Sequence, residues 1–270
     1  MNAYDIEGNA VDTAFSLIGE HRNDIFDMSG LRIGFDRDWL ANAASEQIAE
    51  ISISGTRQGG CTDGEYIYQT SGDTDYYTSM TIIKYKIADG TYTTKTFSGT
   101  PNFGHANDMA YNPNTGYLYV CTMLSDGSVI VLDASDLSYV ETIYLKNASN
   151  ESYKVWQFCY NRWEDCYYSA YSNNYLVYNN EWEYVKTIEM PSSQQATAQG
   201  CETDGQYIYR LTYNPNYIDV AKVDGTYVTT INLSTGGHEP EAIMCDWNGK
   251  FYVSTHQENI ARFFGVKLFN

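Results

Sequence analysis

The chain has 270 residues, enough for one large domain or two small ones with a substantial core. Its 16 lysines and arginines stand against 34 aspartates and glutamates, and a surface with net charge −18 repels nucleic acids and anionic membranes, which excludes both as partners. Tyrosine occurs 26 times and glycine 21 times, and this composition favours an all-β fold.

The first 47 residues form a predicted N-terminal attachment segment. It opens on polar "NAYDIEGN", and no apolar run of 18 residues follows, so we expect neither a signal peptide nor a membrane span. The units "AYDIEGNAV", "AFSLIGEHR" and "IFDMSGLRI" repeat an aromatic residue and a turn glycine every 11 residues, and such short units must pack on a partner or on copies of themselves. Residues 38–49, "DWLANAASEQIA", predict a short helix with Asp38 as N-cap.

Five later segments share one pattern: a polar residue, a short apolar strand, a turn and a Tyr-rich strand. Examples are "QGGCTDGEYIY" and "QGCETDGQYIY", and the starting points lie 49, 49, 43 and 42 residues apart. A period in the forties with several strands per unit indicates a β-propeller. The five segments begin at Gln58, Asn107, Trp156, Gln199 and Glu241.

The second half of each unit also repeats, except in the last. Alternating stretches such as "DGTYTTKTF" and "LSYVETIYL" supply an outer strand in the first four units, which gives four strands each. The last unit lacks this strand, and "IAEISIS", residues 48–54, can supply it from upstream. We therefore predict an all-β, five-bladed β-propeller over residues 48–270, with an N-terminal strand closing the last blade and removing an open edge.

The cysteines fall inside apolar strand-like runs and form no CxxC pair. Buried thiols that act as small hydrophobic residues fit this placement better than disulfides, so we expect six free thiols. These residues are Cys61, Cys121, Cys159, Cys166, Cys201 and Cys245.

The residues that open the five inner strands should ring the mouth of the central channel. Amide and carboxylate groups there can bind the hydroxyls of a sugar, while tryptophan can cover a pyranose face. The alternative is that these side chains only satisfy backbone groups and hold channel waters. With three neighbours from the loops "PNFGHAND" and "STGGHEPE", the predicted ligand-binding residues are Gln58, His105, Asn107, Asp108, Trp156, Gln199, His238 and Glu241.

Metal and catalytic sites are weaker alternatives on the same face. His105, His238 and His256 could act as ligands with nearby carboxylates, but no HxH or HExxH spacing occurs, so we expect neither a metal nor another cofactor. A glycoside hydrolase needs two facing carboxylates, and the blades do not each place an acid at the ring. We name no catalytic residue, and an enzyme is the second hypothesis.

The blade motifs "GHANDMAYNPNTGYLYV", "QGGCTDGEYIY" and "HEPEAIMCDWNGKFYVSTH" resemble those of five-bladed propellers in tail and receptor-binding proteins of phages that infect Gram-positive bacteria. The resemblance implies a virion protein assembled in the host cytoplasm, usually a homotrimer, that binds cell-surface polysaccharide such as teichoic acid or capsule. Residues 1–47 would attach it to other tail proteins. The alternative is a propeller-type glycoside hydrolase or lyase that acts on such a polysaccharide.

Overall fold

The computed structural model describes residues 37–72, 79–190, 197–246 and 248–270 in full. Before residue 37 it describes only the backbone of four short strands, β1 (Ala3–Tyr4), β2 (Ala10–Val11), β3 (Phe26–Met28) and β4 (Leu31–Phe35), which form a sheet in the order β2-β1-β4-β3. The predicted 11-residue repeats lie largely outside the described residues. No helix in the described chain is long and apolar enough to cross a membrane.

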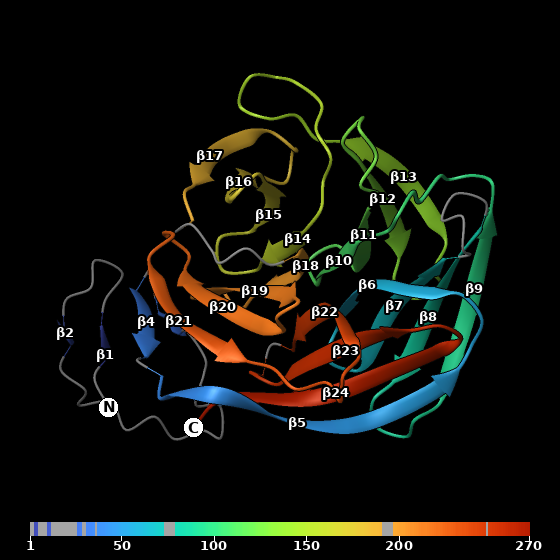
Figure 1. Ribbon diagram of the computed structural model, residues 1–270. Coiled ribbons are helices and arrows are strands. Elements are labelled where there is room, and N and C mark those ends of the chain that lie inside the picture. Colours follow the sequence, from blue (N-terminus) through green and yellow to red (C-terminus); the bar gives the residue numbers. More distant parts are fainter. Residues whose placement is uncertain are drawn as a thin grey trace.

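The rest of the chain is all-β, as predicted, and contains successive four-stranded antiparallel meanders (Figure 1). The first contains β6 (Thr56–Thr62), β7 (Tyr66–Gly72), β8 (Ser79–Lys86) and β9 (Tyr92–Ser98). The second contains β10 (Asp108–Asn112), β11 (Tyr117–Cys121), β12 (Ser128–Asp133) and β13 (Tyr139–Tyr144). The third contains β14 (Phe158–Asn161), β15 (Cys166–Tyr171), β16 (Asn174–Tyr178) and β17 (Tyr184–Ile188). The fourth contains β18 (Thr197–Thr203), β19 (Tyr207–Tyr213), β20 (Tyr217–Lys222) and β21 (Tyr227–Asn232).

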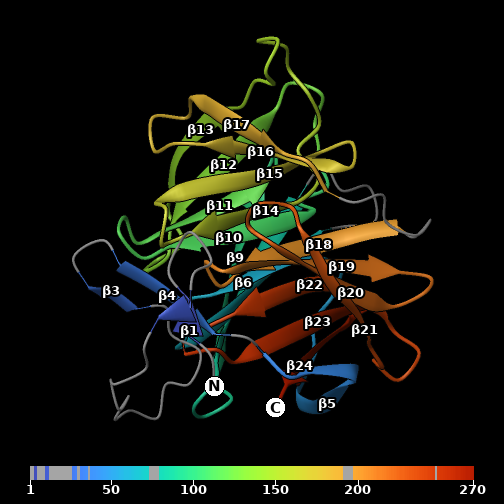
Figure 2. The same ribbon diagram turned by 90° about the vertical axis from the view of Figure 1, so that its left-hand side faces the viewer.

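The last strands of the chain are completed by the strand that precedes the repeats. β22 (Glu239–Cys245), β23 (Phe251–Gln257) and β24 (Ile260–Phe269) form a meander, and β5 (Trp39–Ser52) pairs antiparallel with β24 through Ala261 and Ile51. β5 lies beside β24 at the outer edge of the molecule (Figure 1, Figure 2). The predicted pairing of residues 48–54 with the end of the chain is thus confirmed. The same strand pairs in parallel with β21, Asn42 opposite Asn232, and so joins β18–β21 and β22–β24 into one eight-stranded sheet.

The helix predicted over residues 38–49 is wrong, because this segment belongs to β5. Its alanines and glutamates favour a helix locally, but the ladder with β24 runs as far as Trp39 opposite Phe269. Trp39 and Ala43 also pack on the core beneath. The strand therefore runs across the boundary predicted between residues 47 and 48.

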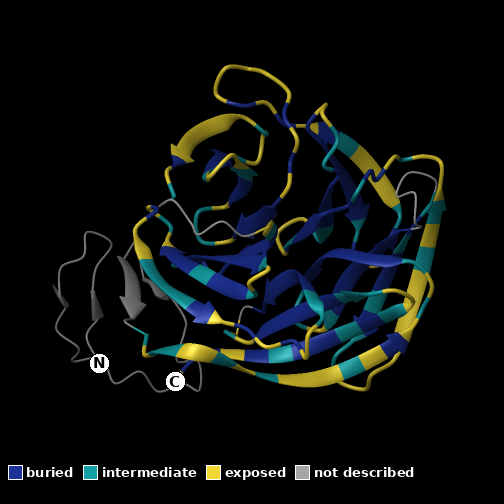
Figure 3. Cartoon of the chain, viewed as in Figure 1, coloured by how far each residue is buried: buried dark blue, intermediate teal, exposed yellow. Residues whose placement is uncertain are grey.

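The inner strands form a closed circle. β6, β10, β14, β18 and β22 each lie against the next, and β22 returns to contact β6. The core fills the spaces between neighbouring sheets, because alternate residues of one strand face opposite neighbours: Ile67 packs against the β22–β24 side and Tyr68 against the β10–β13 side. The inner strands are buried, and exposure rises towards the outer strands (Figure 3).

The turns and the cysteines follow their sequence signals. In the Asp-Gly hairpin between β18 and β19, Gly205 has a φ of +89°, and an added Cβ would overlap the Trp163 indole, so only glycine fits there. All six cysteines are buried in strands, as their positions predicted, and burial raises the pKa of the Cys61, Cys121 and Cys245 thiols.

Candidate functional site

One pocket lies where the inner strands begin, and we call it the mouth pocket. Its volume is about 320 Å³, at the small end of ligand sites, which usually measure roughly 300–1,000 Å³. Its lining residues come from β6, β18, β22 and β23, from the loops before β10 and β14, and from the loop after β11. The lining consists of Thr56, Gln58, His105, Asn107, Met123, Trp156, Thr197, Ala198, Gln199, Glu239, Glu241 and His256.

The structure brings six of the eight predicted site residues together in this pocket. All five predicted ring residues line it, and His105 joins them. Asp108 and His238 are not in the lining. His238 lies in the turn before β22, where its backbone carbonyl accepts a hydrogen bond from Thr235 Oγ1.

Three ring residues reach the pocket through β-bulges at equivalent places in their sheets. The register of β6 shifts between Arg57 and Gly60, that of β18 between Ala198 and Cys201, and that of β22 between Pro240 and Ala242. The extra residues include Gln58, Gln199 and Glu241. A bulge turns a side chain out of the regular alternation, so one repeated backbone device directs three polar groups to the channel mouth.

Hydrogen bonds across neighbouring sheets hold the ring in place. Asn107 Nδ2 donates to the Trp156 carbonyl oxygen at 2.6 Å, and Gln199 Nε2 donates to Glu239 Oε1 at 2.7 Å. Each bond joins two sheets, so the amides that line the pocket also fix the strands. Asn107 and Gln199 therefore have the structural role that we gave as the alternative to ligand binding. Their other side-chain polar atoms can still bind a ligand.

Asp108 lies beneath the mouth pocket and is fully buried, at 0% exposure. Its Oδ2 accepts the backbone N–H of Phe158 at 3.0 Å and of Cys201 at 2.9 Å, while Oδ1 accepts that of Met109 at 3.0 Å. One carboxyl group therefore ties β10, β14 and β18 together at the centre of the molecule. Burial raises its pKa, and the three N–H donors oppose that shift.

A second buried carboxyl group continues this core. Glu202 accepts the backbone N–H of Thr203 at 2.8 Å and that of Cys245 at 3.4 Å, which links β18 to β22. Burial raises its pKa, and the charge of Asp108 adds to the shift. Asp108 and Glu202 thus accept hydrogen bonds from backbone N–H groups of neighbouring strands, so their role is to stabilise the fold.

Glu241 differs from these two acids because it lines the pocket. It is only 3% exposed, and among the described residues no hydrogen bond reaches its carboxyl group. Burial raises the pKa of Glu241 well above its usual range, and the nearby charge of Glu239 raises it further. The raised pKa favours a protonated carboxyl group, which can donate a hydrogen bond as well as accept one.

Histidines line two sides of the pocket. Burial lowers the pKa of His105, which favours the neutral ring at pH 7. His256 stands opposite Glu239 in the β22–β23 ladder, and its Nδ1 is buried without a hydrogen-bond partner. Within the described ranges, no three His, Cys, Asp or Glu side chains are grouped closely enough to hold a metal ion.

Trp156 supplies the aromatic wall. Its backbone carbonyl is fixed by Asn107, while 44% of the residue remains exposed, an unusual exposure for so large an apolar side chain. The pocket therefore combines one accessible indole with amides, carboxyl groups and imidazoles. This is the chemistry that a hydroxyl-rich ligand with one apolar face requires.

Sequence reasoning did not include Glu239 and His256 among the ligand-binding residues. Both face the pocket, but their pairing depends on the register of β22 and β23, which the bulge at Glu241 shifts. The available signal was "HEPE", in which the two glutamates lie two residues apart, the spacing that places side chains on one face of a strand.

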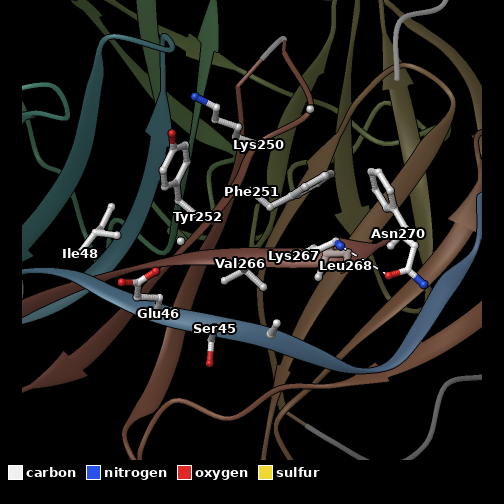
Figure 4. A pocket seen from close by; sticks show the side chains of 14 residues that line it. Ser45, Glu46, Ile48, Lys250, Phe251, Tyr252, Val266, Lys267, Leu268 and Asn270 are labelled. Carbon is white, nitrogen blue, oxygen red and sulfur yellow. Dashed lines mark hydrogen bonds between the residues drawn. The ribbon is translucent and has the colours of Figure 1, made fainter. Parts of the chain in front are cut away.

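A larger groove of about 570 Å³ lies elsewhere, between β5, β24 and the start of β23 (Figure 4). Its walls are mostly apolar, with Phe251 and Val266 among the lining residues, and Lys267 Nζ donates to Asn270 Oδ1 at 3.4 Å at one end. The groove contains none of the predicted site residues. Its size alone does not make it a site of chemistry.

No known sequence family matches the chain, and no curated protein matches it. Among solved structures, it is similar to glutaminyl cyclase from Myxococcus xanthus, with a TM-score of 0.60 and 15% identity over 85% of this chain and 98% of that one. U3-55K (TM-score 0.49, 10% identity, 84% and 99% covered) and the WD40 repeats of RRP9 (0.48, 10%, 86% and 99%) also match. At such identity the similarity shows the fold alone, which is propeller-like.

Proposed function

We propose that this chain is a five-bladed β-propeller that binds a sugar unit of a cell-surface polysaccharide in its mouth pocket. The circle of inner strands and the addition of β5 to the β22–β24 meander support the number of blades. The observation that carries the function is the exposed Trp156 indole beside the amides of Asn107 and Gln199 in one pocket. Binding needs no further chemistry from the chain.

The binding mode follows from the groups in the pocket. The indole covers the apolar C–H face of a pyranose, and Gln58 and Gln199 exchange hydrogen bonds with its hydroxyls. Burial raises the pKa of Glu241, and its carboxyl group, when protonated, can donate to a ring or hydroxyl oxygen. The small volume fits the end or one residue of a glycan rather than a long segment.

The resemblance of the blade motifs to phage receptor-binding proteins extends this proposal. In that setting the protein is a virion component assembled in the host bacterial cytoplasm as a homotrimer, and residues 1–47 attach it to other tail proteins. Its receptor is then teichoic acid or capsule on the host surface. This context rests on the sequence motifs, and the pocket chemistry is compatible with it.

A glycoside hydrolase or lyase is the second proposed function, and one observation favours it. Glu241, with a raised pKa, and Glu239 line the same pocket, and two carboxyl groups in different environments can serve as acid and base. In this account Glu241 donates the proton to the leaving oxygen. Glu239, bound to Gln199, is the second carboxylate.

A glycan array with product analysis distinguishes the two functions. Wild type and Glu241→Gln are tested on the array, and the glycans that bind are incubated with each protein and analysed by mass spectrometry. A binding protein leaves the glycan intact, and Glu241→Gln, which keeps shape and hydrogen-bonding capacity, retains most of the affinity. An enzyme produces fragments with wild type and none with the variant. A wild type that binds no glycan contradicts both.

A further inference from the structure

Unsatisfied polar atoms gather in one place in this protein. Within the described ranges, seven buried side-chain nitrogen or oxygen atoms lack a hydrogen-bond partner, and five of them belong to four residues: Arg57, Gln69, Ser254 and His256. Buried polar groups normally have partners, so such a cluster calls for an occupant. We call these four residues the seam cluster.

Strand register places the four side chains in the contact between the first and last sheets. Residues directly opposite in a ladder share a face, and Gly60 pairs with Gln69 while Ala242 pairs with Ser254. A Cβ added to Gly60 would lie 3.5 Å from that of Ala242, so these faces meet. Gln69 and Ser254 therefore face each other across the seam.

The other two members lie one step nearer the channel mouth. Arg57 pairs with Ser71, two residues beyond Gln69, and His256 lies two residues beyond Ser254 on the same face of β23. β6 lies against both β22 and β23 at this point. The four residues thus share one face of the seam, and His256 also lines the mouth pocket.

Arg57 gives the cluster its charge. It is 0% exposed, and its Nη atoms donate to Ser71 Oγ at 2.6 Å, to the Ile53 carbonyl at 2.7 Å and to the Gly55 carbonyl. No described carboxylate forms an ion pair with it. Burial lowers the pKa of Arg57 to about 10, so the guanidinium remains charged at neutral pH. A buried charge is normally paired, and among the described residues this one has no carboxylate partner.

The hydrogen-bonding inventory favours an anion over water. Arg57 Nε and Gln69 Nε2 can only donate, and Ser254 Oγ and His256 Nδ1 can donate, whereas Gln69 Oε1 is the one obligate acceptor. A water molecule would accept two of these hydrogen bonds and then have few acceptors for its own protons. An anion can accept hydrogen bonds from such donors without needing acceptors of its own, and it also neutralises the guanidinium.

We propose that the seam cluster binds a small monovalent anion, such as a halide, between the β6–β9 sheet and the β22–β24 sheet. Arg57 is fully buried and does not line the mouth pocket, so an anionic group of a larger ligand in that pocket would not reach it. The occupant is therefore a free ion. The ion joins the first and last sheets at the point where the circle of strands closes. It therefore stabilises the closed fold.

Crystals soaked in sodium bromide give the direct test. Anomalous diffraction at the bromine edge should show bromide within hydrogen-bonding distance of Arg57 Nε and Ser254 Oγ. Only water, or a carboxylate of the chain itself, beside Arg57 Nε would overturn the proposal.

Thermal unfolding gives an independent test in solution. Sodium chloride is titrated against sodium gluconate at constant ionic strength, because gluconate is too large for the seam. The melting temperature of wild type should rise by about 3–5 °C for each tenfold increase in chloride above half-saturation. Ser254→Ala should need about tenfold more chloride, since it lacks one donor to a charged group.

Two further variants complete the design. Thr255→Val is the matched control, because Thr255 also has a buried unpartnered hydroxyl on the same strand but is the next residue and faces the opposite side. It should keep the wild-type chloride response. Arg57→Gln, if it folds, should lose that response. Equal responses in wild type, Ser254→Ala and Thr255→Val would contradict the proposal, whether or not Arg57→Gln folds.

Discussion

Asp108→Ala should be among the most destabilising single substitutions in this protein. The change removes the acceptor of three buried backbone N–H groups, those of Met109, Phe158 and Cys201, which lie in three different sheets. Each donor that loses its acceptor costs about 1–3 kcal/mol. Water that enters the vacated space restores part of this, so we expect the free energy of unfolding to fall by about 3–5 kcal/mol.

Urea titration followed by circular dichroism measures this change. Asp108→Asn should lie between Ala and wild type, because its single carbonyl oxygen can accept from Phe158 and Cys201 while its amide nitrogen faces the Met109 N–H. Asp133→Ala is the matched control: the side chain of this half-buried aspartate accepts only from Ser135 in its own turn, and the change should cost about 1 kcal/mol or less. An Asp108→Ala protein within 1 kcal/mol of wild type would refute the assignment of Asp108 as the central tie.

Three other predictions follow from the fold and its buried acids. Deletion of residues 1–36 should leave a cooperatively folding protein, whereas deletion of residues 1–52 should expose the edge of β24 and cause aggregation; equal behaviour in light scattering would contradict the role of β5. Because burial raises the pKa of Glu241, the folded state binds more protons than the unfolded chain. The contribution of Glu241 to stability is therefore complete below the pKa that it has in the unfolded chain. This contribution falls as pH rises, by at most about 1.4 kcal/mol per pH unit. The melting temperature should therefore decrease from pH 5 to pH 8, and Glu241→Gln should make this decrease smaller. An unchanged slope in the variant would contradict a raised pKa for Glu241. The six buried cysteines should resist iodoacetamide in the native protein and all react in urea. A stoichiometric disulfide found by mass spectrometry would contradict six free thiols.

Much of the fold could be predicted because its signals are local and repeated. Asp-Gly turns, alternating strands and a period in the forties each follow from a short stretch of sequence. The helix predicted over residues 38–49 failed because pairing with β24, more than 200 residues away, overrides local propensity. The only sign in the sequence of a pairing between such distant strands is that the last unit lacks its outer strand.

The clustering of most candidate residues was predictable, but the details of the pocket were not. The repeats placed Gln58, Gln199 and Glu241 at equivalent positions, and the structure brings them into one pocket. The role of Asp108 depends on backbone amides of β14 and β18, which no sequence pattern reports. Sequence reasoning did not consider Arg57, because nothing in the sequence shows that it is fully buried or that no described carboxylate pairs with it.

Calorimetric titration of Trp156→Ala with the best glycan from the array tests the central claim most directly. Removal of the indole should weaken binding by about 1–3 kcal/mol, or roughly fivefold to 150-fold in Kd, and leave the melting temperature nearly unchanged, because the side chain lies at the pocket rim. Tyr227→Ala is the control: this outer-strand tyrosine is 51% exposed and lies outside the pocket, so it should bind as wild type does. Wild-type affinity in Trp156→Ala, or an equal loss in both variants, would contradict a sugar site at the channel mouth.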